Sequence, residues 1–203
     1  MKRVLSILAF IICLLPAGAA AKSASSVLDD VSRRLSSLGT AEISFVLTGS
    51  GQQVAGTMYI SGAKTTVRTP GFSMWFDGRT QWTLVESSGE VNITEPTTEE
   101  LLESNPLVIL RNGTSQYNVR RLPDDGTLKV IELTPNRHIP SSVQKAIVKV
   151  DSNNNVAGIG VTFADSSTID IAVRSIKKVA DKPVNFYRFN AAEYPAYEII
   201  DLR

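Results

Sequence analysis

Cysteine and histidine are almost missing from this chain of 203 residues, which contains one of each, Cys13 and His138. A structural zinc site takes about four convergent ligands, mostly Cys and His. Serine hydrolases of the triad type place a histidine beside the nucleophile, whereas His138 has no second ligand or nucleophile near it in the sequence. The sequence therefore predicts a non-enzymatic protein that holds no metal and no other cofactor.

An excess of charge of one sign is also missing. The 21 Lys and Arg residues nearly balance the 20 Asp and Glu residues, so the chain has no basic field of the kind that attracts nucleic acid. Hydrophobic residues make up 43% of the chain and aromatic residues only 7%, a composition that suits one globular domain. We expect a monomer that does not bind nucleic acid.

The N-terminus has the three parts of a secretory signal peptide. Lys2 and Arg3 are followed by an apolar run over 4–15 and by three alanines at 19–21, the small residues that a signal peptidase requires. The run is shorter than the roughly 20 apolar residues that span a bilayer. We expect cleavage after Ala21, which leaves residues 22–203 as one exported domain without cysteine and therefore without disulfides.

The mature chain begins with a helical pattern and continues with a strand pattern. Apolar residues recur at three- and four-residue steps from Val27 to Leu38, and Gly39 ends this stripe. After Gly39 the period is two, with turn signals about every ten residues at 49–51, 61–62, 77–78, 87–89, 124–126, 153–155 and 166–167. The sequence predicts one helix and then about ten or eleven strands in an antiparallel sheet, so the fold class is mainly β.

A strongly apolar stretch interrupts the strand pattern over 97–112. Thr97 followed by Glu100 is typical of a capping box, and Pro106 divides the stretch, so we expect two short helices. A twisted sheet of about ten strands either closes or curls. If the helices lie against the concave face of a curled sheet, the hollow is either filled by side chains or holds a ligand, and the pattern alone leaves both alternatives open.

Several motifs in order along the chain resemble the LolA family of periplasmic lipoprotein carriers. They are the amphipathic first helix, Gly-Thr-Met-Tyr-Ile at 56–60, Asp-Gly-Arg-Thr-Gln-Trp at 77–82, Leu-Thr-Pro at 133–135 and Ile-Ile-Asp at 199–201. The stretch at 90–97 is most similar to the shorter LolA-like proteins of Bacteroidetes. The resemblance implies an unclosed antiparallel β-barrel with an N-terminal helix, a central helical lid and an apolar cavity for lipoprotein acyl chains.

The same resemblance implies partners and site residues. The partners would be lipoproteins and an inner-membrane lipoprotein-releasing ABC transporter in the periplasm, with the outer-membrane acceptor left open; a lipid- or lipoprotein-sensing module without transfer activity is the alternative. Arg68 would be a lid anchor, although Thr69 separates it from Pro70 where the family has arginine directly before proline. The expected lid residues are Leu101, Leu102, Leu107, Ile109 and Leu110. The expected cavity residues are Phe45, Met58, Ile60, Phe72, Met74, Trp82, Leu84, Val91 and Ile93.

Overall fold

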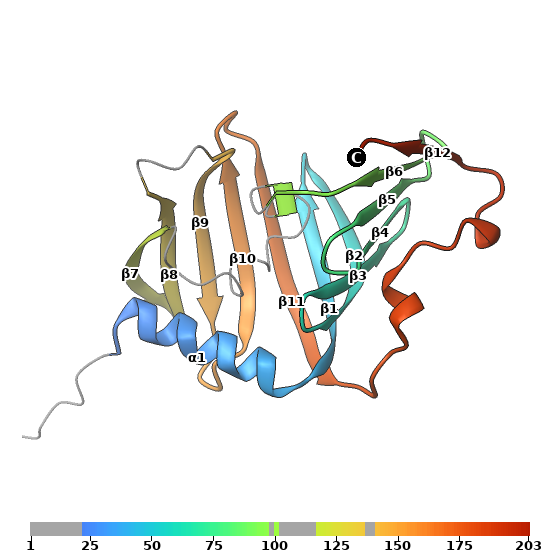
Figure 1. The fold of residues 1–203 in the computed structure, drawn as a ribbon. Helices are drawn as coiled ribbons and strands as arrows, with labels where there is room; N and C mark the ends of the chain where they lie inside the picture. The colour runs from blue at the N-terminus through green and yellow to red at the C-terminus, as the bar shows by residue number, and fades with distance from the viewer. Residues whose placement is uncertain (1–21, 98–99, 102–116, 137–140) are drawn as a thin grey trace, which may run out of the picture.

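One curved sheet of twelve strands forms the body of the protein in the computed structural model (Figure 1), which describes residues 22–97, 100–101, 117–136 and 141–203. The strand order is β12-β6-β5-β4-β3-β2-β1-β11-β10-β9-β8-β7, and its two end strands do not pair, so the sheet is unclosed. The strands are β1 (Thr40–Gly49), β2 (Gln52–Ser61), β3 (Lys64–Thr69), β4 (Phe72–Phe76), β5 (Gln81–Val85), β6 (Glu90–Thr94), β7 (Tyr117–Asp125), β8 (Leu128–Pro135), β9 (Val143–Val150), β10 (Val156–Phe163), β11 (Thr168–Lys178) and β12 (Glu198–Asp201).

The turn signals of the sequence are confirmed. Each of the seven stretches that carry them joins two strands that are neighbours in both the chain and the sheet. Between β1 and β2, for example, Ser50 and Gly51 have φ values of 49° and 76°. Positive φ at both residues of a two-residue loop matches the right-handed twist of the strands that it joins. Local turn chemistry therefore fixes most of the meander.

The strand count and the pairing differ from the expectation of ten or eleven antiparallel strands. The additional strand is β12, which pairs with β6 in parallel, so the sheet is mixed. Residues 179–197 carry the chain from the end of β11 to the β6 edge of the sheet, where β12 is added. This C-terminal segment contains two short 3₁₀ helices, η2 (Val184–Tyr187) and η3 (Ala191–Glu193), and it passes along the β2–β6 part of the sheet before β12 begins (Figure 1).

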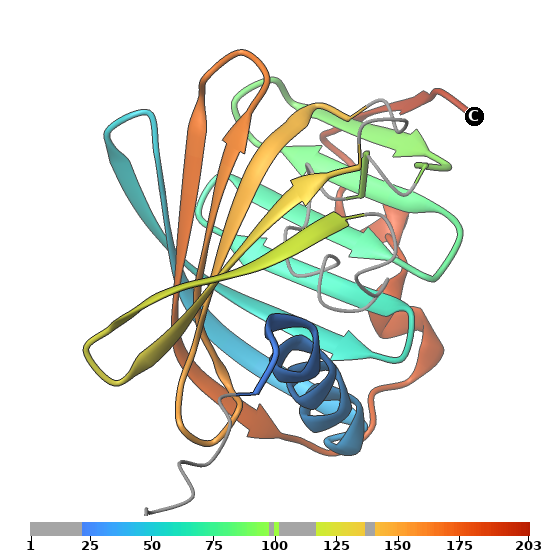
Figure 2. The same cartoon turned by 90° about the vertical axis from the view of Figure 1, so that its left-hand side faces the viewer.

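The first helix, α1 (Ala24–Ser37), confirms the apolar stripe. Ser23 caps its N-terminus by accepting a hydrogen bond from the backbone N–H of Ser26, and Gly39 with a φ of 69° follows its end. Val27, Leu28 and Val31 are buried in the main hydrophobic cluster together with residues of the strands. Figure 2 shows α1 near one end of the curved sheet. Among the described residues, no helix is long and apolar enough to cross a membrane.

The sheet has a hydrophobic cluster on each of its two faces. The main cluster lies on the concave face with α1 and includes Ile43, Phe45 and Met74. The second cluster is built on Trp75, Leu84 and Val91 of β4, β5 and β6, and aromatic residues of the C-terminal segment pack against it. Because successive side chains of a strand point to opposite faces, Met74 belongs to the main cluster and Trp75 to the second cluster. The C-terminal segment therefore covers the convex face of β4–β6.

Aromatic contacts and an ion pair help to hold the C-terminal segment on the sheet. The ring of Trp75 lies 5.4 Å from that of Phe189 and 5.6 Å from that of Tyr194, both edge to face. The carboxylate of Asp77 accepts hydrogen bonds from the backbone N–H groups of Arg79 and Thr80, at 3.1 and 3.0 Å, and from Nε of Arg188 at 2.9 Å. Burial raises the pKa of Asp77, but these hydrogen bonds and the Arg188 charge outweigh it and leave that pKa below 3.8.

We predict that Asp77→Asn destabilises the protein at neutral pH but not at low pH. A pKa that is lower in the folded state gives stability that is complete above the unfolded pKa and is lost as the pH falls through the folded one. Near pH 7 the free energy of unfolding of the variant should be lower by about 1 kcal/mol. The effect is modest because Arg188 is half exposed, so solvent screens its charge. Urea unfolding from pH 7 to pH 3 measures this difference, and the exposed Asp29→Asn on α1 is the control. A difference that does not change with pH would contradict the role of the charge.

Candidate functional site: a cavity on the concave face

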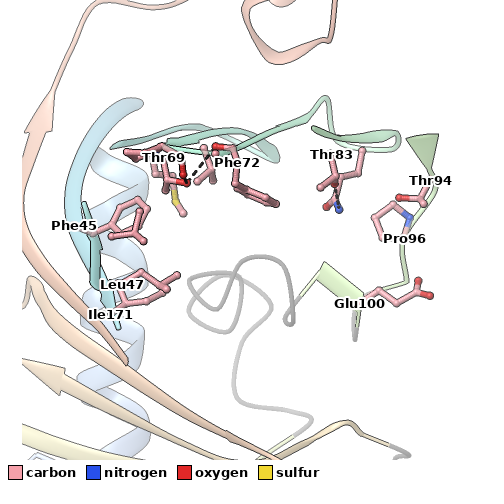
Figure 3. A pocket seen from close by; sticks show the side chains of 15 residues that line it. Phe45, Leu47, Thr69, Phe72, Thr83, Thr94, Pro96, Glu100 and Ile171 are labelled. Carbon is pink, nitrogen blue, oxygen red and sulfur yellow. Dashed lines mark hydrogen bonds between the residues drawn. The ribbon is translucent and has the colours of Figure 1, made fainter. Parts of the chain in front are cut away.

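A cavity of about 730 Å³ lies on the concave face of the sheet, with Pro96 and Glu100 among the residues that line it. Most of its wall is apolar, and β1, β2 and β11 contribute Phe45, Leu47, Met58 and Ile171 to it. Figure 3 shows Phe45, Leu47 and Ile171 together at one side of this space and Thr83, Thr94 and Glu100 at the other. Pockets for small molecules have volumes of about 300–1,000 Å³ and mostly apolar walls, so the cavity has the size and chemistry of a site for an apolar ligand.

Gly56 on β2 allows the ring of Phe45 to lie where it does in the wall. The two residues are direct neighbours across the β1–β2 pair. A Cβ added to Gly56 would meet the Phe45 ring, with its Cε2 at only 2.9 Å, and Cγ2 of Thr69 at 2.7 Å. Glycine within a strand often marks such a close approach. The Gly-x-x-x-Ile motif thus has a structural reason, because its glycine makes room for an aromatic ring of the cavity wall.

The structure brings together some of the predicted cavity residues. Phe45, Met58 and Phe72 line the cavity. Phe45 and Met58 are also buried in the main cluster, and Phe72 packs against it. Met74 is fully buried in the same cluster. Ile60 adjoins the same cluster but lines a separate cavity of about 430 Å³ beside the end of α1.

Four residues that were predicted to line the cavity lie on the convex face instead, so this prediction is corrected. They are Trp82, Leu84, Val91 and Ile93. Trp82, Leu84 and Val91 belong to the second cluster, and Ile93 is the register partner of Trp82. They are apolar because the C-terminal segment covers them, not because they face the cavity. Alternation in the sequence shows that a strand has two different faces, but only the tertiary structure decides which of them lines the hollow.

Arg68 also lies on the convex face. Its guanidinium carbon is 4.2 Å from the centroid of the Trp75 ring, and its Nη1 donates a hydrogen bond of 3.2 Å to the Tyr194 hydroxyl. The expected role of a lid anchor is therefore corrected, because Val67 and Thr69, and not Arg68, are the β3 residues that line the cavity. Arg68 instead holds the C-terminal segment.

The predicted lid falls mostly outside the described residues. Leu102, Leu107, Ile109 and Leu110 lie outside them. The capping box is confirmed, because the backbone N–H of Glu100 donates to Oγ1 of Thr97 at 3.3 Å and that of Thr97 donates to Oε2 of Glu100 at 2.7 Å. Glu100 and Leu101 are helical, and Leu101 packs against the main cluster.

Sequence reasoning missed two groups of lining residues. The first is apolar and includes Leu47, Val54, Val67 and Ile171. Leu47 on β1 and Val54 on β2 could have been predicted, because strand alternation places them on the same faces as Phe45 and Met58. The second group is polar and comes from β5 and β6, namely Gln81, Thr83 and Thr94. Among the described lining residues, Glu100 alone has an ionisable side chain. Within the part of the chain that the structure describes, no three His, Cys, Asp or Glu residues form a group that could hold a metal ion.

Comparison with known proteins identifies the family. A model described as outer membrane lipoprotein carrier protein LolA matches residues 16–173, more than half of the chain. The chain belongs to the LolA family. This family consists of periplasmic carriers that are not enzymes, and membership suggests a lipoprotein carrier role. No curated protein sequence matches the chain.

One of two similar solved structures supports the fold of this LolA family member, namely the first described here. An uncharacterised conserved protein from Thermus thermophilus has a TM-score of 0.59 at 9% identity, with 89% of this chain and 99% of that chain covered. A LolA superfamily protein from Nitrosomonas europaea has a TM-score of 0.44 at 13% identity, with 83% and 99% covered.

We predict that Gly56→Ala destabilises the fold by about 1–3 kcal/mol, the usual cost of overpacking. The added methyl group collides with the Phe45 ring, so Phe45→Leu in the same chain should recover part of the loss. Denaturant unfolding of the two single variants and the double variant measures this coupling. Gly49→Ala is the matched control, because a Cβ there meets no atom closer than 3.7 Å. Additive effects of the two substitutions would contradict the close approach.

Proposed function

We propose that this protein is a periplasmic carrier that binds the acyl chains of lipoproteins in the concave cavity and transfers them from the inner membrane towards the outer membrane. The observation that supports this most is the combination of LolA family membership with an apolar cavity of about 730 Å³ on the inner face of the curved sheet. Residues 1–21 would be the signal peptide that directs export.

Transfer free energies explain why such a carrier needs a cavity. Each methylene exposed to water costs about 0.8 kcal/mol, so two or three long chains cannot cross an aqueous compartment unshielded. The cavity wall is hydrocarbon at Phe45, Leu47, Met58 and Ile171. Transfer of an acyl chain from a membrane to this wall therefore costs little free energy. Loose apolar contact also permits release, which a set of charge pairs would hinder.

The energy for extraction would come from outside this chain. We propose an inner-membrane lipoprotein-releasing ABC transporter as the donor, because nothing in the sequence resembles a phosphate-binding loop. The acceptor at the outer membrane is left open. A lipid-sensing module would share the cavity but would bind lipid without passing it on, so transfer is the activity that separates the two functions.

We predict that Val54→Phe weakens lipid binding by about tenfold or more while the protein remains folded. Val54 lines the cavity on β2, so a phenyl ring there fills space that acyl chains would occupy. A synthetic lipopeptide with S-diacylglyceryl cysteine and a fluorescent label measures binding, and release of lipoproteins from spheroplasts measures transfer. Val46→Phe is the matched control, since Val46 precedes the cavity residue Leu47 on β1 and points to the other face.

Two results would contradict the proposal. Equal binding by both variants would show that lipid does not occupy this cavity. Binding by the wild-type protein without release of any lipoprotein from spheroplasts, in the presence of the transporter, would favour the sensing module.

A further inference from the structure

A cavity of about 500 Å³ on the convex face is lined by residues of both the sheet and the C-terminal segment. Arg68 of β3 and Trp75 of β4 belong to the sheet, and the rings of Phe186 and Phe189 come from the C-terminal segment. Oγ1 of Thr66 donates a hydrogen bond of 3.1 Å to the backbone oxygen of Phe186, which fixes this part of the wall. The volume is within the range of sites for small ligands, and none of the described lining residues is shared with the concave cavity.

Arg68 brings a positive charge into this wall without a carboxylate beside it. Its guanidinium has five N–H donors, but it makes one hydrogen bond, to the Tyr194 hydroxyl, and stacks on the Trp75 ring. It forms no ion pair within the described part of the chain, and its register partners are Thr57 and Ser73. Because Arg68 is half-buried, its charge costs free energy that an uncharged cover for Trp75 would avoid. An anionic ligand would explain this charge.

The other charged residues that line the cavity are exposed and already have partners. Arg188 binds the carboxylate of Asp77 at 2.9 Å, and Oε1 of Glu193 accepts a hydrogen bond of 2.8 Å from Nδ2 of Asn190. Solvent screens the exposed Glu193 more than the half-buried Arg68. The cavity therefore favours an anion with a single charge, because a phosphate monoester with nearly two charges would meet stronger repulsion from Glu193.

We propose that this convex cavity binds a carboxylate carried by an apolar body, with the carboxylate oxygens on the free N–H groups of Arg68 and the body against Phe186 and Phe189. The planar fork of an arginine matches a carboxylate with two parallel hydrogen bonds. Such a group is found in free organic acids and at the C-terminus of a peptide that ends in an apolar residue. The site lies on the face opposite to the concave cavity and is independent of the carrier function.

The test compares 3-phenylpropanoate with 3-phenylpropanamide, two probes of the same shape that differ in charge. An NMR titration of residues 22–203 at pH 7 follows the indole N–H of Trp75. The acid should bind about tenfold more tightly than the amide, the discrimination expected from charge-assisted hydrogen bonds, and added salt should reduce this ratio. The peptide acetyl-Ala-Ala-Phe, with a free or an amidated C-terminus, distinguishes the two sources. Tighter binding of the free peptide than of 3-phenylpropanoate favours a peptide, and weaker binding favours an organic acid.

Two substitutions change the charge of the cavity in opposite directions. Arg68→Gln should bring the ratio of acid to amide affinity close to one, although it can also loosen the C-terminal segment. Glu193→Gln keeps an oxygen for Asn190 and should raise the affinity for the acid about two- to threefold without changing that for the amide. The matched controls make the same changes outside the cavity, at Arg34 on α1 and Glu198 on β12 (Arg34→Gln and Glu198→Gln), and should leave the ratio unchanged.

Three results would overturn the proposal. They are equal binding of the acid and the amide, binding of neither probe, and a ratio that neither Arg68→Gln nor Glu193→Gln alters. Because none of these substitutions touches the described wall of the concave cavity, lipid binding there is measured separately and the carrier proposal stands or falls by itself.

Discussion

The packing of Trp75 beneath the C-terminal segment is the interaction on which the arrangement of this protein depends. Trp75 is 2% exposed although it lies on the convex face of an open sheet. Arg68 stacks on its ring, and Phe189 and Tyr194 approach it edge to face. Without this cover β4–β6 would present a row of large apolar side chains to water, a surface that soluble monomers rarely expose. The cover therefore lets these strands be apolar on the outside.

That cover explains the two different ends of the cavity. Strands β1 and β2 place their apolar residues on the concave face, where they form the main cluster and the apolar wall. Strands β5 and β6 place theirs under the C-terminal segment, and their inward positions carry Gln81, Thr83 and Thr94. One hollow thus receives hydrocarbon from one part of the sheet and hydrogen-bonding groups from another.

The sequence predicted what local interactions decide. The seven turns, the stripe of α1 and the Thr97–Glu100 capping box were all readable, because each depends on residues close together in the chain. The orientation of Trp82 and Leu84 was not readable, because alternation defines two faces without saying which one is covered. Likewise β12 is only four residues long, and its position depends on the path of residues 179–197 before it. Neither its length nor its hydrophobic pattern could therefore predict a parallel strand.

The unpaired edges of the sheet bear on how a carrier of this kind can release its cargo. In a closed barrel the number and stagger of the strands fix the diameter, whereas a sheet whose end strands do not pair can change its curvature without breaking a ladder of hydrogen bonds. Such an edge invites pairing with other chains unless it is blocked. On β7 the ion pairs Arg120–Glu132 and Arg121–Asp124, together with Pro123, discourage such pairing. The β7 edge is therefore protected by its side chains rather than by closure of the sheet.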